Sequence, residues 1–311
     1  MKFRNDNMLL YIAMADASCI CVEYVDPEGG CHDALIQDAL NCYEYLSHPK
    51  YSALKKSQYT DDTEMSCANA KVLIYNHIII PQTFADAWVT EYRRGGKREG
   101  YGRGLQSVLN TCKNGTDFLH KINPHSDRNG AAMRAVPFGV VPMISDVLNI
   151  ATAQACITNN TRAGLFSSRA VALLSHLALY TDIPLNQIGA MCYWELSSIE
   201  RRMYEHVFFE PWDDRIGRYM RHGVLIPLSV VTVHAVVQLL RSCTSLMDMR
   251  RQVIRWGGDT DSVAAIAWGI ASCRMQDEVL PVFLARDLEN GNSLTGTLYL
   301  QSLGTQLMNR F

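Results

Sequence analysis

Long segments whose apolar residues recur at helical spacing constrain the fold of this chain more than any other feature. Residues 227–243 stay apolar over about four helical turns after Pro227, and residues 260–273 form another such segment, opened by small polar residues that could cap it. Residues 164–180 place one apolar face at a period near 3.6, made of Leu165, Phe166, Ala170, Leu173, Leu174, Leu177 and Ala178. No series of short β-branched runs alternates with these segments, which argues against a Rossmann or barrel architecture. We therefore predict an all-α fold, a single compact orthogonal helical bundle.

Composition and the lack of linker-like segments indicate one domain. The chain has 311 residues, of which 48% are apolar and 19% are charged, enough to bury a large core. No Pro/Gly/Ser-rich linker, low-complexity tract or internal repeat marks a boundary. We expect a single domain over residues 1–311.

Charge and hydropathy limit the kinds of partner and the cellular compartment that we expect. The formal charge of −2 gives no basic field for nucleic acid or anionic lipid. No uninterrupted apolar stretch reaches the roughly 18 residues of a membrane helix, and the N-terminus lacks a long secretory apolar region. The ten cysteines are scattered without paired CxxC spacing, which indicates reduced, mostly buried thiols. We expect a cytoplasmic protein without a membrane segment.

Two short acidic motifs carry the chemistry. Residues 59–66 read YTDDTEMS and residues 257–262 read GGDTDS, so each combines carboxylates with a hydroxyl. These are hard oxygen donors of the kind that magnesium and manganese favour. Burying several carboxylates together without a cation destabilises a fold, so such clusters imply either exposure or metal. Taken singly, each motif is also compatible with a capped helix start.

Three further segments carry a resemblance to a known family. Residues 13–24 contain Asp16 and Glu23 seven positions apart, residues 100–104 read GYGRG, and residues 129–139 read NGAAMRAVPFG. Together with the two acidic motifs, they resemble the ADP-ribosylglycohydrolases, a family that includes the dinitrogenase-reductase-activating glycohydrolase and the ADP-ribosylarginine hydrolases.

The resemblance implies a metal centre. Members of that family are all-α proteins with two divalent cations, here Mg²⁺ or Mn²⁺, at the base of a cleft in which ADP-ribose lies. The positions that match the metal motifs are Thr60, Asp61 and Asp62 for one cation and Asp259 and Ser262 for the other, with Asp261 as the expected bridge. Ser262 replaces the commoner threonine and keeps the hydroxyl.

The resemblance also implies a reaction, the hydrolysis of the bond between ADP-ribose and its acceptor, which reverses ADP-ribosylation. Glu23 is the candidate acid/base or substrate-positioning residue, and Asp62 is a second carboxylate that could activate water. Arginine-linked protein is favoured over serine-linked, nucleic-acid-linked and small-molecule acceptors. Two alternatives stay open, a non-catalytic ADP-ribose-binding or structural member and another two-metal hydrolase such as a phosphodiesterase or phosphatase.

Glycine-rich loops supply the expected substrate contacts, because small residues let backbone amides approach a diphosphate. The residues expected to contact substrate are Gly102, Gly104, Ser126, Asn129, Gly130, Ala131 and Met133. Arg134 is expected to pair with an acid of the core and brace its loop rather than to bind phosphate. Tyr101 is interpreted as a packing residue rather than as a base-stacking one.

Two departures from the family pattern affect these expectations. Ala15 and Cys19 stand where the opening segment of the family has glycines, so helix packing near Glu23 is expected to differ. Asn159 stands where the family commonly has histidine, and asparagine cannot become cationic. We expect changed substrate contacts there rather than a lost metal site.

Overall fold

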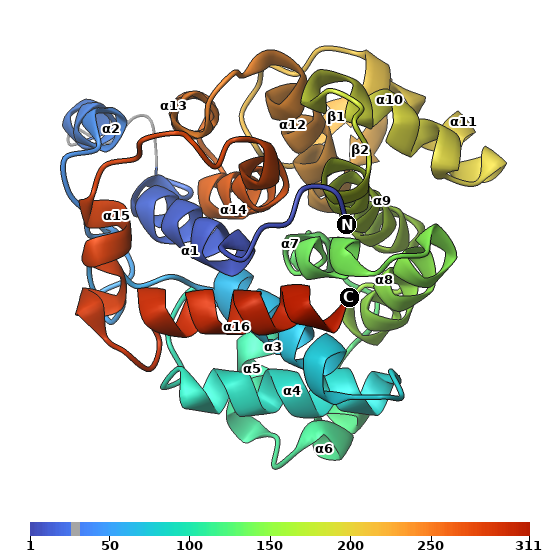
Figure 1. Ribbon diagram of the computed structural model, residues 1–311, viewed down its shortest axis with the longest axis horizontal. Helices are drawn as coiled ribbons and strands as arrows, with labels where there is room; N and C mark the ends of the chain where they lie inside the picture. The colour runs from blue at the N-terminus through green and yellow to red at the C-terminus, as the bar shows by residue number, and fades with distance from the viewer. Residues whose placement is uncertain (26–31) are drawn as a thin grey trace.

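The computed structural model describes residues 1–25 and 32–311 and is built almost entirely from helices (Figure 1). The α-helices are α1 (Met8–Cys19), α2 (His32–Asn41), α3 (Asp61–Tyr75), α4 (Pro81–Arg94), α5 (Arg103–Thr111), α6 (Gly115–Lys121), α7 (Gly130–Met133), α8 (Ile144–Thr158), α9 (Arg162–Tyr180), α10 (Leu185–Glu195), α11 (Ser198–Phe209), α12 (Leu228–Ser242), α13 (Leu246–Trp256), α14 (Thr260–Ala271), α15 (Phe283–Arg286) and α16 (Thr297–Arg310). Short 3-10 turns are η1 (Ile20–Val22), η2 (Val136–Val140), η3 (Ser272–Arg274) and η4 (Leu288–Gly291).

The three helical segments predicted from apolar spacing are confirmed as α9, α12 and α14. Thr161 precedes α9 and accepts a hydrogen bond from the Gly164 amide, which caps the helix two residues before the predicted start. Pro227 is the N-cap of α12, so the helix itself begins at Leu228. At α9 a local cap, which period alone does not show, therefore sets the boundary.

Helices α1 and α14 lie side by side at the centre of the molecule (Figure 1). Every residue of both helices is buried, as expected for helices that are apolar around their whole circumference. Helices α3, α9, α12, α13 and α16 cover this central pair. One hydrophobic cluster, extending in sequence from Met8 to Met308, forms the core. The predicted all-α fold class is confirmed, and a single domain over 1–311 stays a prediction consistent with that shared core.

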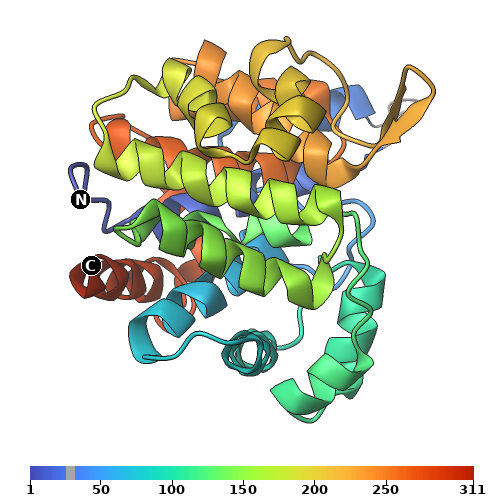
Figure 2. The ribbon, with the colours of Figure 1, turned by 90° about the vertical axis from the view of Figure 1, so that its right-hand side faces the viewer.

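A small β-hairpin is the only sheet among the described residues. Strands β1 (Tyr219–Arg221) and β2 (Val224–Ile226) pair antiparallel, with Arg221 opposite Val224. His222 and Gly223 connect them with φ of 47° and 76°, the left-handed pair typical of a tight hairpin turn. Figure 2 shows the hairpin projecting from the helical body, and its base leads directly into α12.

Other sequence expectations can be compared with the described part of the chain. Nine cysteines are free thiols there, most of them buried, and Cys31 lies outside the described residues. Of the helices in residues 1–25 and 32–311, none combines the length and the apolar character needed to cross a bilayer.

His234, in α12, is a buried histidine whose ring is held in the neutral form. Its Nε2 lies 3.0 Å from the Glu210 carbonyl oxygen, and its ring is 5.2 Å from the ring of Trp212. Burial lowers the pKa of His234 to about 4, and the neighbouring His206 and Arg241 act in the same direction. Protonating this side chain inside the fold is therefore unfavourable.

The pH dependence of stability follows from this shift. The unfolded state, with an ordinary histidine pKa near 6.5, binds the proton at a higher pH than the folded state does. His234 therefore contributes stability that is fully present above pH 6.5 and is lost as the pH falls towards 4, at most about 3 kcal/mol. Urea unfolding of the wild type and of His234→Gln between pH 4 and 8 measures it. The difference between the two free energies of unfolding should shrink as the pH falls; a constant difference would contradict the prediction.

Candidate active site

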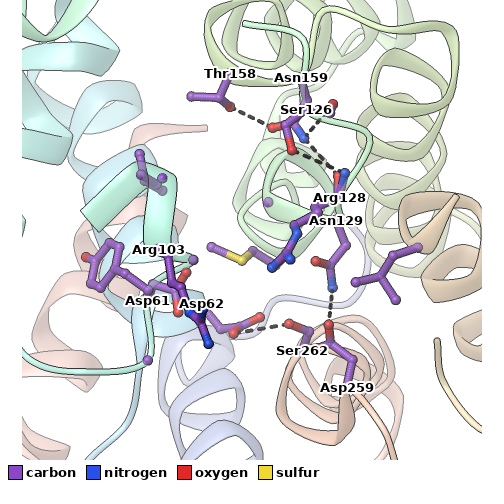
Figure 3. Close-up of a pocket in the computed structure, with 18 of the residues that line it drawn as sticks. Asp61, Asp62, Arg103, Ser126, Arg128, Asn129, Thr158, Asn159, Asp259 and Ser262 are labelled. Atoms are coloured by element: carbon purple, nitrogen blue, oxygen red, sulfur yellow. Dashed lines mark hydrogen bonds between the residues drawn. The ribbon is translucent and has the colours of Figure 1, made fainter. Parts of the chain in front are cut away.

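A large cleft, of about 1280 Å³, opens between the N-terminal ends of α3 and α14 and the loop before α7 (Figure 3). Asp61 and Asp62 of the first motif and Asp259 and Asp261 of the second lie at its floor, and Figure 3 shows Asp62 beside Ser262. This volume exceeds the roughly 300–1,000 Å³ of common small-ligand sites. The cleft therefore has room for a nucleotide-sized ligand and part of an attached group.

The first acidic motif is held by an acid from another helix. Asp16, in α1, accepts hydrogen bonds from the Thr60 and Thr63 backbone amides at 2.9 and 3.2 Å, and from their hydroxyls at 2.9 and 2.6 Å. It thereby caps the N-terminus of α3, where Thr60 has no side-chain cap bond of its own. Asp16 is thus committed to orienting the segment that carries Asp61 and Asp62.

The second motif is shaped by two consecutive glycines with positive φ, Gly257 at 64° and Gly258 at 84°. Ile216 donates its amide hydrogen to the Gly257 carbonyl at 3.0 Å and accepts one from the Asp259 amide at 3.1 Å. A Cβ atom on Gly258 would lie 2.0 Å from the Ile216 carbonyl oxygen. Only glycine therefore allows the approach that aims Asp259 at the cleft.

The two motifs meet although almost two hundred residues of chain separate them. The Ser262 hydroxyl donates to Asp62 Oδ2 at 3.3 Å (Figure 3). Asp259 Oδ2 accepts hydrogen bonds from Tyr24 Oη at 2.9 Å and from Asn129 Nδ2 at 3.3 Å. The spatial convergence expected from the sequence is therefore observed.

Three carboxylate oxygens at this junction are buried without a hydrogen-bond partner among the described residues, namely Oδ1 of Asp62, Asp259 and Asp261. Burial raises the pKa of all three groups, and for Asp62 and Asp261 the charges of neighbouring acids raise it further. Grouped acids with free oxygens are costly unless a cation compensates them. The donor set therefore fits hard divalent cations.

Glu23 belongs to the same acidic group. One carboxylate oxygen each from Glu23, Asp259 and Asp261 lies within 4.8 Å of the other two, and all three residues are buried. Burial, reinforced by the charge of Asp259, raises the pKa of Glu23 to about 8. This trio could hold a metal ion, and it places Glu23 beside the second motif.

Most of the expected substrate contacts line the cleft, namely Gly102, Gly104, Ser126, Asn129, Gly130 and Met133. Ala131 does not, because its side chain is buried and its carbonyl accepts a hydrogen bond from Gln154 Nε2 at 2.8 Å. Thr60 is also fully buried behind the cleft wall, with its hydroxyl donated to Asp16. Tyr101 packs at right angles to Tyr92 and donates to Glu64 at 2.7 Å, in agreement with its interpretation as a packing residue.

Arg134 braces its loop as expected, but the prediction that its partner is an acid was wrong. The guanidinium is fully buried and donates to Gln154 Oε1 and to Thr158 Oγ1, both at 2.6 Å, with its Cζ 4.1 Å from the Trp88 ring centroid. No carboxylate of the described chain forms an ion pair with it. Desolvation lowers its pKa to about 9. The guanidinium is therefore bound by two neutral acceptors and the face of the Trp88 ring instead of by the expected acid.

Asn159 continues this network to the loop before α7 (Figure 3). Its Oδ1 accepts from Thr158 Oγ1 at 2.7 Å, and its Nδ2 donates to the Ser126 and Arg128 carbonyls at 3.1 and 2.8 Å. All the hydrogen-bonding groups of the Asn159 side chain are therefore occupied by protein atoms. The side chain lines the cleft, but its bonds serve to position the loop.

Residues that sequence reasoning missed also line the cleft, namely Tyr24, Tyr51, Arg103 and Arg128. Adjacency to Glu23 in sequence could have indicated Tyr24. Tyr51 follows Glu23 by 28 positions in a segment with no motif, so no sequence signal could have found it. Arg128 lies within the predicted loop, and its charge acts to lower the pKa of both Glu23 and Asp259.

Comparisons with known proteins agree with this geometry. A protein of Archaeoglobus fulgidus, described as uncharacterized, is 25% identical over 289 residues, which cover 88% of this chain and 87% of that protein. A solved structure described as an ADP-ribosylglycohydrolase-related protein complex matches the fold with a TM-score of 0.70 at 20% identity, over 98% of this chain and 96% of the other. The family model for ADP-ribosylglycohydrolase matches residues 9–311, and this chain therefore belongs to the ADP-ribosylglycohydrolase family.

Proposed function

We propose that this protein is a metal-dependent ADP-ribosyl-acceptor hydrolase, which cleaves the glycosidic bond between ADP-ribose and its acceptor. The observation that carries the proposal is the convergence of both acidic motifs at one cleft floor, with buried carboxylate oxygens that no described protein group satisfies. Membership of the family supplies the chemical class of the substrate.

Two divalent cations, Mg²⁺ or Mn²⁺, would be held by the two motifs. The ligand set proposed is Thr60, Asp61 and Asp62 for one cation and Asp259, Asp261 and Ser262 for the other, with Asp261 shared. When bound, such cations orient substrate hydroxyls and polarise water. The free Oδ1 atoms of Asp62, Asp259 and Asp261 support this assignment.

The protein side chains would divide the remaining work. Glu23 would act as the acid/base or positioning carboxylate for the departing acceptor, and Asp62 would take the proton from attacking water. Asn129, Gly130 and Ser126 line the cleft and would provide hydrogen-bond donors to the diphosphate. Arginine-linked protein remains the favoured acceptor, on the resemblance to the ADP-ribosylarginine hydrolases.

The test is release of free ADP-ribose from arginine-, serine- and nucleic-acid-linked substrates by purified protein with Mg²⁺, Mn²⁺ or EDTA. Metal-dependent release from one linkage would support the proposal and identify the acceptor class. AMP or free phosphate as product would favour a two-metal phosphodiesterase or phosphatase instead. Metal-dependent thermal stabilisation by ADP-ribose, without release from any linkage, would favour a non-catalytic binder.

Asn159→His is expected to weaken substrate binding rather than to improve it. An imidazole cannot donate to the Ser126 and Arg128 carbonyls together as the asparagine amide does at 3.1 and 2.8 Å. Losing these bonds frees the loop that lines the cleft. We expect KM to rise about 10-fold, with a smaller change in kcat.

Asn160→His is the matched control, because Asn160 is exposed and its side chain makes no hydrogen bond in the described structure. Steady-state kinetics on the substrate that the wild type cleaves should show no change for this variant. An Asn159→His protein with lower KM than the wild type would show that the side chain acts on the ligand rather than on the loop.

A further inference from the structure

A short turn, residues 48–51, contacts Glu23 at two points. The Tyr51 hydroxyl donates to Glu23 Oε2 at 2.9 Å, and His48 Nε2 lies 2.8 Å from the Glu23 carbonyl oxygen. Tyr51 also lines the cleft. One segment, distant in sequence, thus holds both the carboxylate and the main chain of the same residue.

Hydrogen bonding fixes the tautomer of His48. Its Nδ1 accepts the backbone amide hydrogens of Lys50 and Tyr51 at 3.0 and 3.1 Å. A ring nitrogen that accepts carries no proton, so Nε2 carries it and donates to the Glu23 carbonyl. The imidazole stacks on the Tyr51 ring with centroids 4.1 Å apart and planes at 21°. His48 therefore fixes the phenol ring and the Glu23 backbone together.

The backbone next to Glu23 needs such support. Tyr24 has φ of 45°, a left-handed conformation that bulky residues rarely adopt. Its amide donates to the Gly258 carbonyl at 2.9 Å, and its hydroxyl binds Asp259. A strained residue persists only where its surroundings determine it. His48 and Gly258 thus bind the two polar groups of one peptide unit, the carbonyl of Glu23 and the amide of Tyr24, just before this bend.

The hydrogen bond from Tyr51 occupies only one oxygen of Glu23. Within residues 1–25 and 32–311, no protein donor binds the other oxygen, Oε1. The carboxylate lies beside Asp259 and Asp261 in the cleft. A carboxylate with one oxygen held and the other oxygen free has the arrangement that acid/base catalysis requires.

We propose that Tyr51 is a positioning residue, fixed by its stack on His48, which holds Glu23 Oε2 so that Oε1 remains available to the substrate. The inference rests on the proposed function, because that function assigns the acid/base role to Glu23. Tyr51 does not react; it acts through Glu23.

The test is a double-mutant cycle of Tyr51→Phe and Glu23→Gln, with kcat and KM measured on the linkage that the wild type cleaves. Tyr51→Phe keeps the ring stack and removes only the hydroxyl. We expect it to lower kcat about 10-fold to 100-fold, with little change in KM. In the Glu23→Gln protein the same change should have no further effect. Equal losses in both backgrounds would show that Tyr51 has a merely structural role and would overturn the proposal.

Tyr75→Phe is the control for removing a phenol hydroxyl, because Tyr75 is exposed and its hydroxyl binds Gln306. Crystal structures of the wild type and Tyr51→Phe give a second readout, in which the Glu23 carboxylate should lose its single orientation. If the wild type releases ADP-ribose from no linkage, the proposed function fails, and these structures still decide the positioning role. An unchanged Glu23 in the variant would overturn it.

Discussion

Asp261→Asn is expected to lower metal-dependent turnover by more than about 10³-fold. The residue is almost completely buried near Glu23, Asp62 and Asp259, and its Oδ1 has no hydrogen-bond partner among the described residues, so it would be free for the bridging role proposed for it. An amide oxygen is a weaker ligand than a carboxylate. Kinetics with Mg²⁺ and Mn²⁺ measure the loss, and full activity in this variant would remove Asp261 from the site.

The same variant should show an opposite effect on stability when metal is removed. In EDTA, replacing one of several adjacent carboxylates relieves repulsion, so the Tm should rise by about 2–4 °C. Addition of Mg²⁺ should raise the Tm of the wild type more than that of the variant. Asp38→Asn, at an exposed position of α2, removes the same charge and is expected to change neither quantity. Equal responses to Mg²⁺ in wild type and Asp261→Asn would contradict this account.

Gly258→Ala is expected to destabilise the fold by about 3 kcal/mol or more and to abolish activity. The residue has φ of 84°, and the new Cβ would lie 2.0 Å from the Ile216 carbonyl oxygen, which belongs to the backbone and cannot rotate away. Relieving this overlap must separate Ile216 from the turn. Because the Ile216 carbonyl also accepts the hydrogen bond from the Asp259 amide, Asp259 would move with Ile216. Urea unfolding measures the stability loss.

Gly96→Ala separates the two contributions to that loss. Gly96 has nearly the same φ, 82°, but no heavy atom lies within 4 Å of the position that its Cβ would take. Its substitution should therefore cost only the left-handed penalty of about 1–2 kcal/mol, with activity retained. Equal losses at both glycines would show that backbone conformation alone, and not the contact with Ile216, makes Gly258 necessary.

Much of the fold could be predicted because the signal is local. The apolar residues of α9, α12 and α14 recur at a period that only a helix can bury, whatever its neighbours are. The hairpin was not predicted, because strands of three residues are too short to show alternation. Its turn at His222 and Gly223 is visible only as backbone geometry.

The candidate site divides in the same way. Asp62, Asp259 and Asp261 were identified because carboxylates repeat at short spacing beside helix starts, and the structure places them together. Their roles as metal ligands stay predictions. Asp16 matched a family segment, but its use as the cap of α3 came from the structure. Arg134 was expected to have an acidic partner, and no spacing rule could name Gln154 or Thr158 instead.

The sequence by itself determined the helical class, the two acidic motifs and the family resemblance, because periodicity and ligand chemistry are properties of short segments. Tertiary structure alone decided which groups meet. It brought Tyr51 to Glu23, Asp16 to Thr60 and Ile216 to Gly258 across large sequence separations. Such contacts depend on how whole helices pack, and packing is set by the sum of many buried surfaces rather than by any local pattern.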